Sequence, residues 1–98
     1  MDVEFADEEL RRLYVEQGFT AGFSKDIVKR YRKLVQAIIA AVDERTFYAM
    51  KSLHYEKLKG NRSHQRSMRL NRQWRLILEL REESPKKIVV IISIEDYH

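Results

Sequence analysis

The sequence predicts an α+β fold in which N-terminal helices pack on a small, mainly antiparallel β-sheet. Apolar residues between positions 25 and 42 recur at helical spacing, whereas from position 65 onward they alternate with polar residues, as in strands. A third observation is the run 88–94, which is apolar on both faces of a predicted strand. Because a chain of 98 residues is too short to divide its core, we expect one domain over residues 1–98.

The chain is predicted to begin with a short strand and a helix. Val3 and Phe5 alternate with polar neighbours, which is typical of a strand. Asp7 is then a suitable N-cap, because its side chain can accept a hydrogen bond from a free amide of the first helical turn. The apolar face of this first helix consists of Leu10, Leu13 and Tyr14. Gly18 and Gly22 interrupt the pattern that follows.

A longer helix and a shorter helical piece complete the predicted cover of the sheet. Ser24 is a suitable N-cap for the longer helix. Its apolar residues, spaced by three and four, are Ile27, Tyr31, Leu34, Ile38 and Val42. Residues 46–53 predict a further short helical piece in which Phe47 and Met50 face inward.

The second half of the chain predicts strands. Ser67, Arg69 and Asn71 alternate with Met68 and Leu70, and after a connection at 71–73 a second alternating strand follows. One face of that strand carries Trp74, Leu76, Leu78 and Leu80. Residues 82–87 form a second predicted turn, which leads into the strand 88–94. A central position covered by helices explains why that last strand is apolar on both faces.

Basic residues are concentrated in one part of the chain. Residues 51–81 contain nine Lys or Arg and two Glu, so this stretch carries +7 while the whole chain carries +4 and the remainder sums to −3. Such a stretch suits a polyanion, because each cation placed near a phosphate gains Coulomb energy and releases a counterion. A merely solvated surface is the alternative explanation.

Two arginines lie at strand positions from which their side chains can bind a phosphate or take part in catalysis. Arg69 and Arg75 each lie between two apolar residues of the predicted hairpin, so burial of one face presents both guanidinium groups on the other. A guanidinium held on a strand can bind a phosphate through two hydrogen bonds and can stabilise charge that develops on it.

Acid–base residues are expected at two places. Asp96, Tyr97 and His98 directly follow the last strand, and His54 precedes the basic loop. RNA can be cleaved without a metal if a base removes the proton of a 2′-hydroxyl, a cation stabilises the phosphorane, and an acid protonates the departing oxygen. Ordinary solvated residues are the alternative at both places, because most histidines have no catalytic role.

Several classes of protein are disfavoured. The chain has no cysteine, so it can form neither a disulfide framework nor a thiolate zinc site. Its three histidines lack the spacing of helical metal ligands, and we expect no metal or other cofactor. Without a signal-like start or an apolar run long enough to span a bilayer, we expect a cytoplasmic protein with no membrane partner.

Three ordered motifs carry a resemblance to a known family over essentially the whole chain. They are Leu58-Lys59-Gly60-Asn61-Arg62, then Ser67-Met68-Arg69-Leu70-Asn71-Arg72-Gln73-Trp74-Arg75-Leu76, and finally Glu95-Asp96-Tyr97-His98. On these motifs the chain resembles the RelE/HigB superfamily of toxins, and within it the HigB-like plasmid maintenance killer group. The resemblance implies a RelE-like fold and a toxin of a type II toxin–antitoxin pair.

The resemblance also implies an activity, partners and site residues. It implies a ribosome-dependent mRNA endoribonuclease that enters the ribosomal A site, cleaves translated mRNA and inhibits translation. The expected partners are a HigA-like antitoxin, which forms a hetero-oligomer with the toxin, and the ribosome with its mRNA. The catalytic residues it implies are His54, Asp96, Tyr97, His98 and Arg75. The predicted RNA-binding residues are Lys57, Lys59, Arg62, Arg66 and Arg69.

Two alternatives to this assignment remain at the level of the sequence. Members of the group commonly have Leu-His-Pro-Leu-Lys-Gly where this chain is two residues longer, so either His54 or Glu56 corresponds to the loop histidine. The protein could also be a noncatalytic module that binds RNA or an antitoxin. A DNA-binding repressor ranks last, because no helix-turn-helix is recognisable and the basic residues lie mainly on the predicted hairpin.

Overall fold

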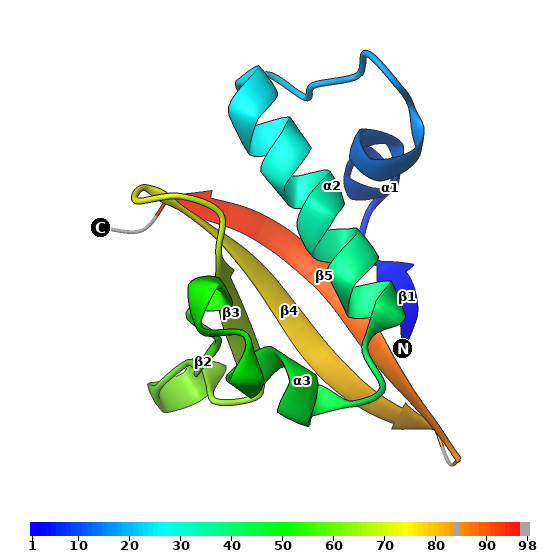
Figure 1. Cartoon of the computed structure of the whole chain (residues 1–98), viewed down its shortest axis with the longest axis vertical. Coiled ribbons are helices and arrows are strands. Elements are labelled where there is room, and N and C mark those ends of the chain that lie inside the picture. Colours follow the sequence, from blue (N-terminus) through cyan, green and yellow to red (C-terminus); the bar gives the residue numbers. More distant parts are fainter. Residues whose placement is uncertain (84, 97–98) are drawn as a thin grey trace.

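The computed structural model describes residues 1–83 and 85–96, and it has the predicted α+β architecture (Figure 1). The strands are β1 (Asp2–Phe5), β2 (Glu56–Lys57), β3 (Gln65–Arg69), β4 (Trp74–Glu83) and β5 (Lys86–Asp96). The helices are α1 (Glu8–Val15), α2 (Lys25–Ala40) and α3 (Glu44–Ala49), with 3-10 turns η1 (Lys51–Leu53) and η2 (Gly60–Arg62). Within the described residues, no helix is both long enough and apolar enough to cross a membrane.

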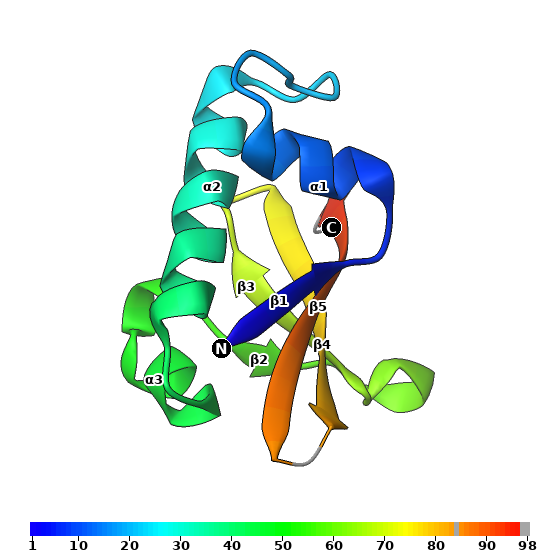
Figure 2. The ribbon, with the colours of Figure 1, turned by 90° about the vertical axis from the view of Figure 1, so that its right-hand side faces the viewer.

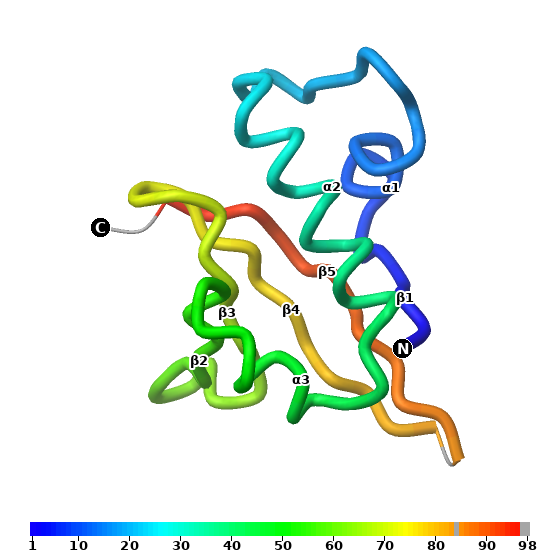
Figure 3. Tube along the Cα trace, in the orientation of Figure 1, coloured from blue at the N-terminus to red at the C-terminus, as the bar shows by residue number. Residues whose placement is uncertain are grey.

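The five strands form one mixed sheet in the order β1-β5-β4-β3-β2. All neighbours are antiparallel except β1 and β5, which run parallel. The hairpin of β4 and β5 supplies the longest pairing, and a bulge between Ile77 and Leu78 shifts its register. The end of β5 lies beside the β3–β4 connection, where Trp74 is paired with Asp96 (Figure 3).

The two faces of the sheet have different surroundings. Helices α2 and α3 lie on one face, and the segment with η2 lies on the opposite side (Figure 2). The main core fills the helix-covered face, where its most deeply buried side chains are Leu13, Tyr31, Leu34, Val35, Ile38, Phe47, Met68, Leu76, Leu78, Val89 and Ile91. The Tyr31 hydroxyl is also satisfied, because it donates to the carbonyl of Leu10 at 2.8 Å. Along β3 and β4, Met68 and Leu76 lie on this face whereas Arg69 and Arg75 lie on the other, so the predicted alternation of these strands is confirmed.

Local capping explains where the helices begin. The Asp7 side chain accepts from the Leu10 amide at 2.8 Å, and the Ser24 hydroxyl accepts from the Ile27 amide at 3.3 Å, as predicted for both N-caps. Asp43 caps α3 in the same way, accepting from the Arg45 amide at 2.9 Å.

Three expectations about these elements are wrong in detail. Val42 does not belong to the long helix: α2 ends at Ala40, and Val42 is 85% exposed, because the extended chain at Ala41 leads into the Asp43 cap. Met50 does not face inward but is 38% exposed at the end of α3, whereas Phe47 is buried as predicted. The predicted turn over 82–87 is shorter, since β4 continues to Glu83 and β5 begins at Lys86.

The cover of the last strand also differs from the expectation. β5 is an internal strand, paired with β1 and β4. The helices cover only one of its faces, so Val90, on the other face, is half-buried while Val89 and Ile91 are fully buried. The apolar character of β5 reflects its internal position more than cover on both faces.

Candidate functional site

The face of the sheet opposite α2 and α3, called the open face below, carries a row of charged side chains. Arg69 on β3 is paired with Arg75 on β4, which is paired with Glu95 on β5. Side chains of directly opposed residues lie on the same face of a sheet. The register therefore places these three side chains side by side on the open face.

A hydrogen-bonded network connects this row to the loop that contains η2. Arg62 donates to both carboxylate oxygens of Glu95, from Nη1 at 3.0 Å and from Nη2 at 2.8 Å. The Ser93 hydroxyl donates to the same carboxylate at 2.7 Å. On its other side, the Arg62 Nε donates to the Gln65 amide oxygen at 2.8 Å, and the Gln65 Nε2 donates to Glu79 at 3.1 Å. The loop is thereby held against the sheet.

The network changes the acid–base properties of its two central groups. The bidentate bond from Arg62, assisted by that from Ser93, lowers the pKa of Glu95 below its usual value. The same bond raises the pKa of Arg62. Glu95 is therefore ionised at neutral pH, and its charge offsets that of Arg62.

A pocket of about 190 Å³ opens between the loop and the sheet. Its lining consists of Leu58, Arg62, Ser67, Arg75, Ile77, Glu95 and Asp96. The Nε and Nη1 atoms of Arg75 are buried. Because burial removes competing water from a guanidinium, its interaction with an approaching anion is stronger than that of a fully solvated cation.

Two of the predicted acid–base residues lie close to this row. Asp96 lines the pocket, and its Oδ2 accepts from the Gln73 Nε2 at 3.0 Å. His54 adopts a left-handed backbone conformation, with φ of 47°, at the end of η1. Its Nε2 lies 3.4 Å from Nη1 of Arg69. Tyr97 and His98, predicted with them, lie outside the described residues.

The predicted RNA-binding residues fall into two groups. Arg62 and Arg69 lie at the site just described, and Lys59, exposed, directly precedes η2. Arg66 is directed to the helix-covered side, where its Nε lies 3.3 Å from a carboxylate oxygen of Glu44 and its Nη1 donates to the Ser63 carbonyl at 3.1 Å. Lys57 is exposed on β2 and is paired with Arg66. The structure brings Arg62, Arg69 and Arg75 together and separates Arg66 from them.

Sequence reasoning did not identify Glu95, Gln65 or Gln73 as parts of the site. The strand alternation contained a signal for Glu95, since it is the polar residue that precedes Asp96 at the end of an apolar strand. Glu56, the alternative to His54, is exposed on β2 and paired with Ser67. Within residues 1–83 and 85–96, no group of three or more His, Cys, Asp or Glu is arranged to hold a metal ion.

Comparisons with solved structures identify the fold. The YoeB/ParE toxin from Agrobacterium tumefaciens is similar over 100% of both chains, with a TM-score of 0.61 and 14% identity. The YoeB chain of a YoeB-YefM complex from Staphylococcus aureus matches with a TM-score of 0.59 and 23% identity, over 100% of this chain and 97% of that one. YafQ from E. coli strain BL21(DE3) matches with a TM-score of 0.57 and 13% identity, over 97% and 91%.

The sequence comparison identifies the family. The model that matches residues 3–98 describes the RelE-like toxin of the type II toxin–antitoxin system HigB. A search of curated proteins finds no match. The fold and this match define a RelE-like toxin of a type II toxin–antitoxin system. Within that class, the chain belongs to the HigB-like toxin family, as its three motifs predicted.

Proposed function

We propose that this toxin is a ribosome-dependent endoribonuclease that cleaves translated mRNA in the ribosomal A site without a metal ion. The observation that carries the proposal is Arg75, a partly buried guanidinium that lines the open-face pocket beside Asp96. Arg69 and Arg62 flank it. Arg62 and Arg75 line the pocket, and Arg69 is paired with Arg75 beside it, so these guanidinium groups form a cluster suited to a phosphodiester.

The proposed reaction is an internal transesterification. A base removes the proton of the 2′-hydroxyl, the 2′-oxygen attacks the adjacent phosphorus, and the bond from phosphorus to the 5′-oxygen breaks. An acid donates a proton to that leaving oxygen, so the products are a 2′,3′-cyclic phosphate and a 5′-hydroxyl. Arg75 stabilises the negative charge of the phosphorane.

The acid and base come from the group His54, Asp96, Tyr97 and His98. Asp96 lines the pocket, and its position is supported by the Gln73 amide. His54 reaches the same row of charges through its contact with Arg69. An imidazole suits either role because one ring nitrogen can accept a proton while the other donates one. Arg62, Arg69, Lys57 and Lys59 are proposed to bind the message and ribosomal RNA, whereas Arg66 is held by Glu44 on the helix-covered side.

Two macromolecular partners follow from this proposal. A HigA-like antitoxin binds the toxin in a hetero-oligomer and keeps it from the ribosome, and the ribosome supplies the bound message. A staphylococcal relative is known in such a pairing, the YoeB-YefM complex. Recognition through charge suits the ribosomal partner, since residues 51–81 carry a net charge of +7 while the whole chain carries +4.

The test is a comparison of Arg75→Ala with Arg81→Ala in a reconstituted translation system. Arg81 is a matched control because it lies on the same face of the same strand, near the other end, where its guanidinium forms an ion pair with Glu4. Primer extension on the message should show cleavage within translated codons for the wild type and the Arg81 variant. We expect Arg75→Ala to lose about 100-fold or more of the cleavage rate.

Other outcomes of the same experiment have defined meanings. Arrested translation with an intact message would show that the protein is a noncatalytic module that binds RNA and is not a nuclease. Equal cleavage of ribosome-free RNA would retain the chemistry and remove the ribosome dependence. Equal losses in the two arginine variants would remove the special role of Arg75.

A further inference from the structure

Beside α1, the edge strand β1 is shorter than β5, the strand to which it is paired. β1 is paired with β5 from Asp2–Ile88 to Phe5–Ile91, and the Ala6 amide donates to the Ile91 carbonyl at 2.8 Å. The chain then leaves the sheet, because Asp7 caps α1. β5 itself continues to Asp96 and is paired there with β4 only, among residues 1–83 and 85–96. Residues 92–96 therefore form a strand edge.

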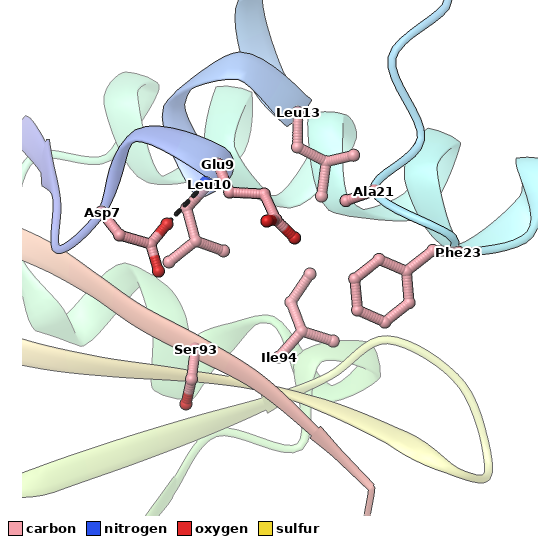
Figure 4. Close-up of a pocket in the computed structure, with 8 residues that line it drawn as sticks. All are labelled: Asp7, Glu9, Leu10, Leu13, Ala21, Phe23, Ser93 and Ile94. Atoms are coloured by element: carbon pink, nitrogen blue, oxygen red, sulfur yellow. Dashed lines mark hydrogen bonds between the residues drawn. The ribbon is translucent and has the colours of Figure 1, made fainter.

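A pocket of about 200 Å³ lies directly beside this edge (Figure 4). Its apolar lining consists of Leu10, Leu13, Ala21, Phe23 and Ile94. The Ser93 side chain points away from the other lining residues, so the main chain of β5 borders the pocket at that position. Phe23 is held in place by an edge-to-face contact with Trp74, with ring centroids 5.4 Å apart.

The charge of the pocket is opposite to that of the protein as a whole. Asp7 and Glu9 line it, and the described lining includes no Lys or Arg. The Glu9 carboxylate points into the pocket, whereas Asp7 uses one oxygen to cap the Leu10 amide (Figure 4). Carboxylates repel phosphate groups, so the pocket disfavours RNA and favours a cationic group.

The size of the pocket indicates a side chain as the occupant. Small-molecule sites usually have volumes of about 300–1,000 Å³, which exceeds this pocket. A strand edge next to an apolar hollow is the arrangement by which proteins bind extended peptides: main-chain hydrogen bonds supply affinity, and the hollow receives one side chain.

We infer that residues 92–96 of β5 and the adjoining pocket bind an extended segment of the antitoxin, which adds as a strand beside β5. The segment places one aliphatic side chain between Leu13, Phe23 and Ile94 and a Lys or Arg against Glu9 and Asp7. The added strand runs alongside Asp96, next to the proposed RNA site. The inference goes beyond the proposed nuclease activity and does not depend on it.

Hydrogen–deuterium exchange on the complete toxin, alone and in complex with its cognate antitoxin, tests the strand addition. We expect those amides of residues 92–96 that point away from β4 to exchange more slowly in the complex, because new interstrand bonds protect them. A matched measurement replaces the antitoxin by a short RNA. Unchanged exchange at this edge in the antitoxin complex, or protection by the RNA alone, would overturn the inference.

Charge reversal tests the pocket. Glu9→Lys should weaken antitoxin binding by roughly tenfold or more, because a like charge then faces the cation of the partner. Glu9→Gln should have a smaller effect in the same direction. Glu56→Lys is the matched control: it makes the same charge change at an exposed residue on β2, the opposite edge of the sheet, and should leave the dissociation constant within about twofold. Equal affinities for Glu9→Lys and Glu56→Lys would contradict the proposal.

Discussion

Strands β3 and β4 contribute apolar side chains to the core on one face of the sheet and charged side chains to the candidate site on the other. On one face, Met68, Leu76 and Leu78 are completely buried against the helices. On the other, Arg69, Arg75 and Glu95 lie side by side, and Arg75 and Glu95 line a small pocket. Since successive side chains of a strand point to opposite faces, the packing that anchors one face also positions the charges of the other.

The comparison predicts that substitutions on the two faces separate stability from activity. Stability should depend mainly on the helix-covered face, because the deepest burial of apolar area is found there. Activity should depend mainly on the open face, where cations surround a pocket. Four substitutions, ordered by the size of their expected effects, test this separation.

Leu78→Ala should have the largest effect, on stability. The side chain is fully buried in the core, and its truncation should lower the free energy of unfolding by about 2–5 kcal/mol, through lost transfer energy and the cavity left behind. Urea denaturation followed by circular dichroism measures the change. Val90→Ala, on a half-buried position of the open face, is the control and should cost clearly less. Equal losses of unfolding free energy in the two variants would contradict the prediction that stability depends mainly on the helix-covered face.

Arg75→Lys should have the next largest effect, on catalysis. Lysine retains the positive charge but not the fork that binds two oxygens of one phosphate. We expect a loss of roughly 10–100-fold in single-turnover RNA cleavage, less than for removal of a complete donor. Arg81→Lys serves as the control on the same strand face. Full activity of Arg75→Lys would mean that charge alone is required.

Arg66→Ala and Arg69→Ala should have different effects, although both arginines lie on β3. Arg66 contacts Glu44, which also accepts from the Tyr55 hydroxyl at 2.7 Å, so its loss weakens the attachment of α3 to the sheet. We expect about 1–2 kcal/mol of lost stability, as for other partly buried hydrogen bonds to charged groups. Arg69→Ala should cost less than about 1 kcal/mol and should instead weaken RNA binding. The reverse order in denaturation would contradict the assignment of Arg66 to the helix-covered side.

Glu95→Gln should have the smallest effect, and that effect depends on pH. Because Arg62 lowers the pKa of Glu95, the ionised pair stabilises the folded state above the usual carboxyl range and loses this contribution as the pH falls through the lowered value. The pair is more than one third exposed, so we expect no more than about 1 kcal/mol at pH 7. Denaturation from pH 7 to pH 3 should show wild type and variant converging. A difference that grows on acidification would reverse the sign and refute the pairing.

Some parts of the site were predictable because they depend on local geometry. The alternation around Arg69 and Arg75 indicated that both would leave the core on the same face, and the structure shows them directly paired. The catalytic roles of His54, Asp96, Tyr97 and His98 stay predictions, and the last two lie outside the described residues. Arg66 looked equivalent to its basic neighbours, because charge in a sequence does not reveal a partner such as Glu44 that is 22 residues away.

The sequence by itself determined the class of fold, the main helix caps and the two faces of the hairpin. These features follow from periods of two and 3.6 residues and from side chains that bond to their own neighbours in the chain. Only the tertiary structure decided that Arg62 is bound by Glu95, 33 residues away, and that β1 ends at Phe5 while β5 continues to Asp96. Such contacts depend on loop paths and strand register, which the packing of the whole chain selects and no local pattern contains.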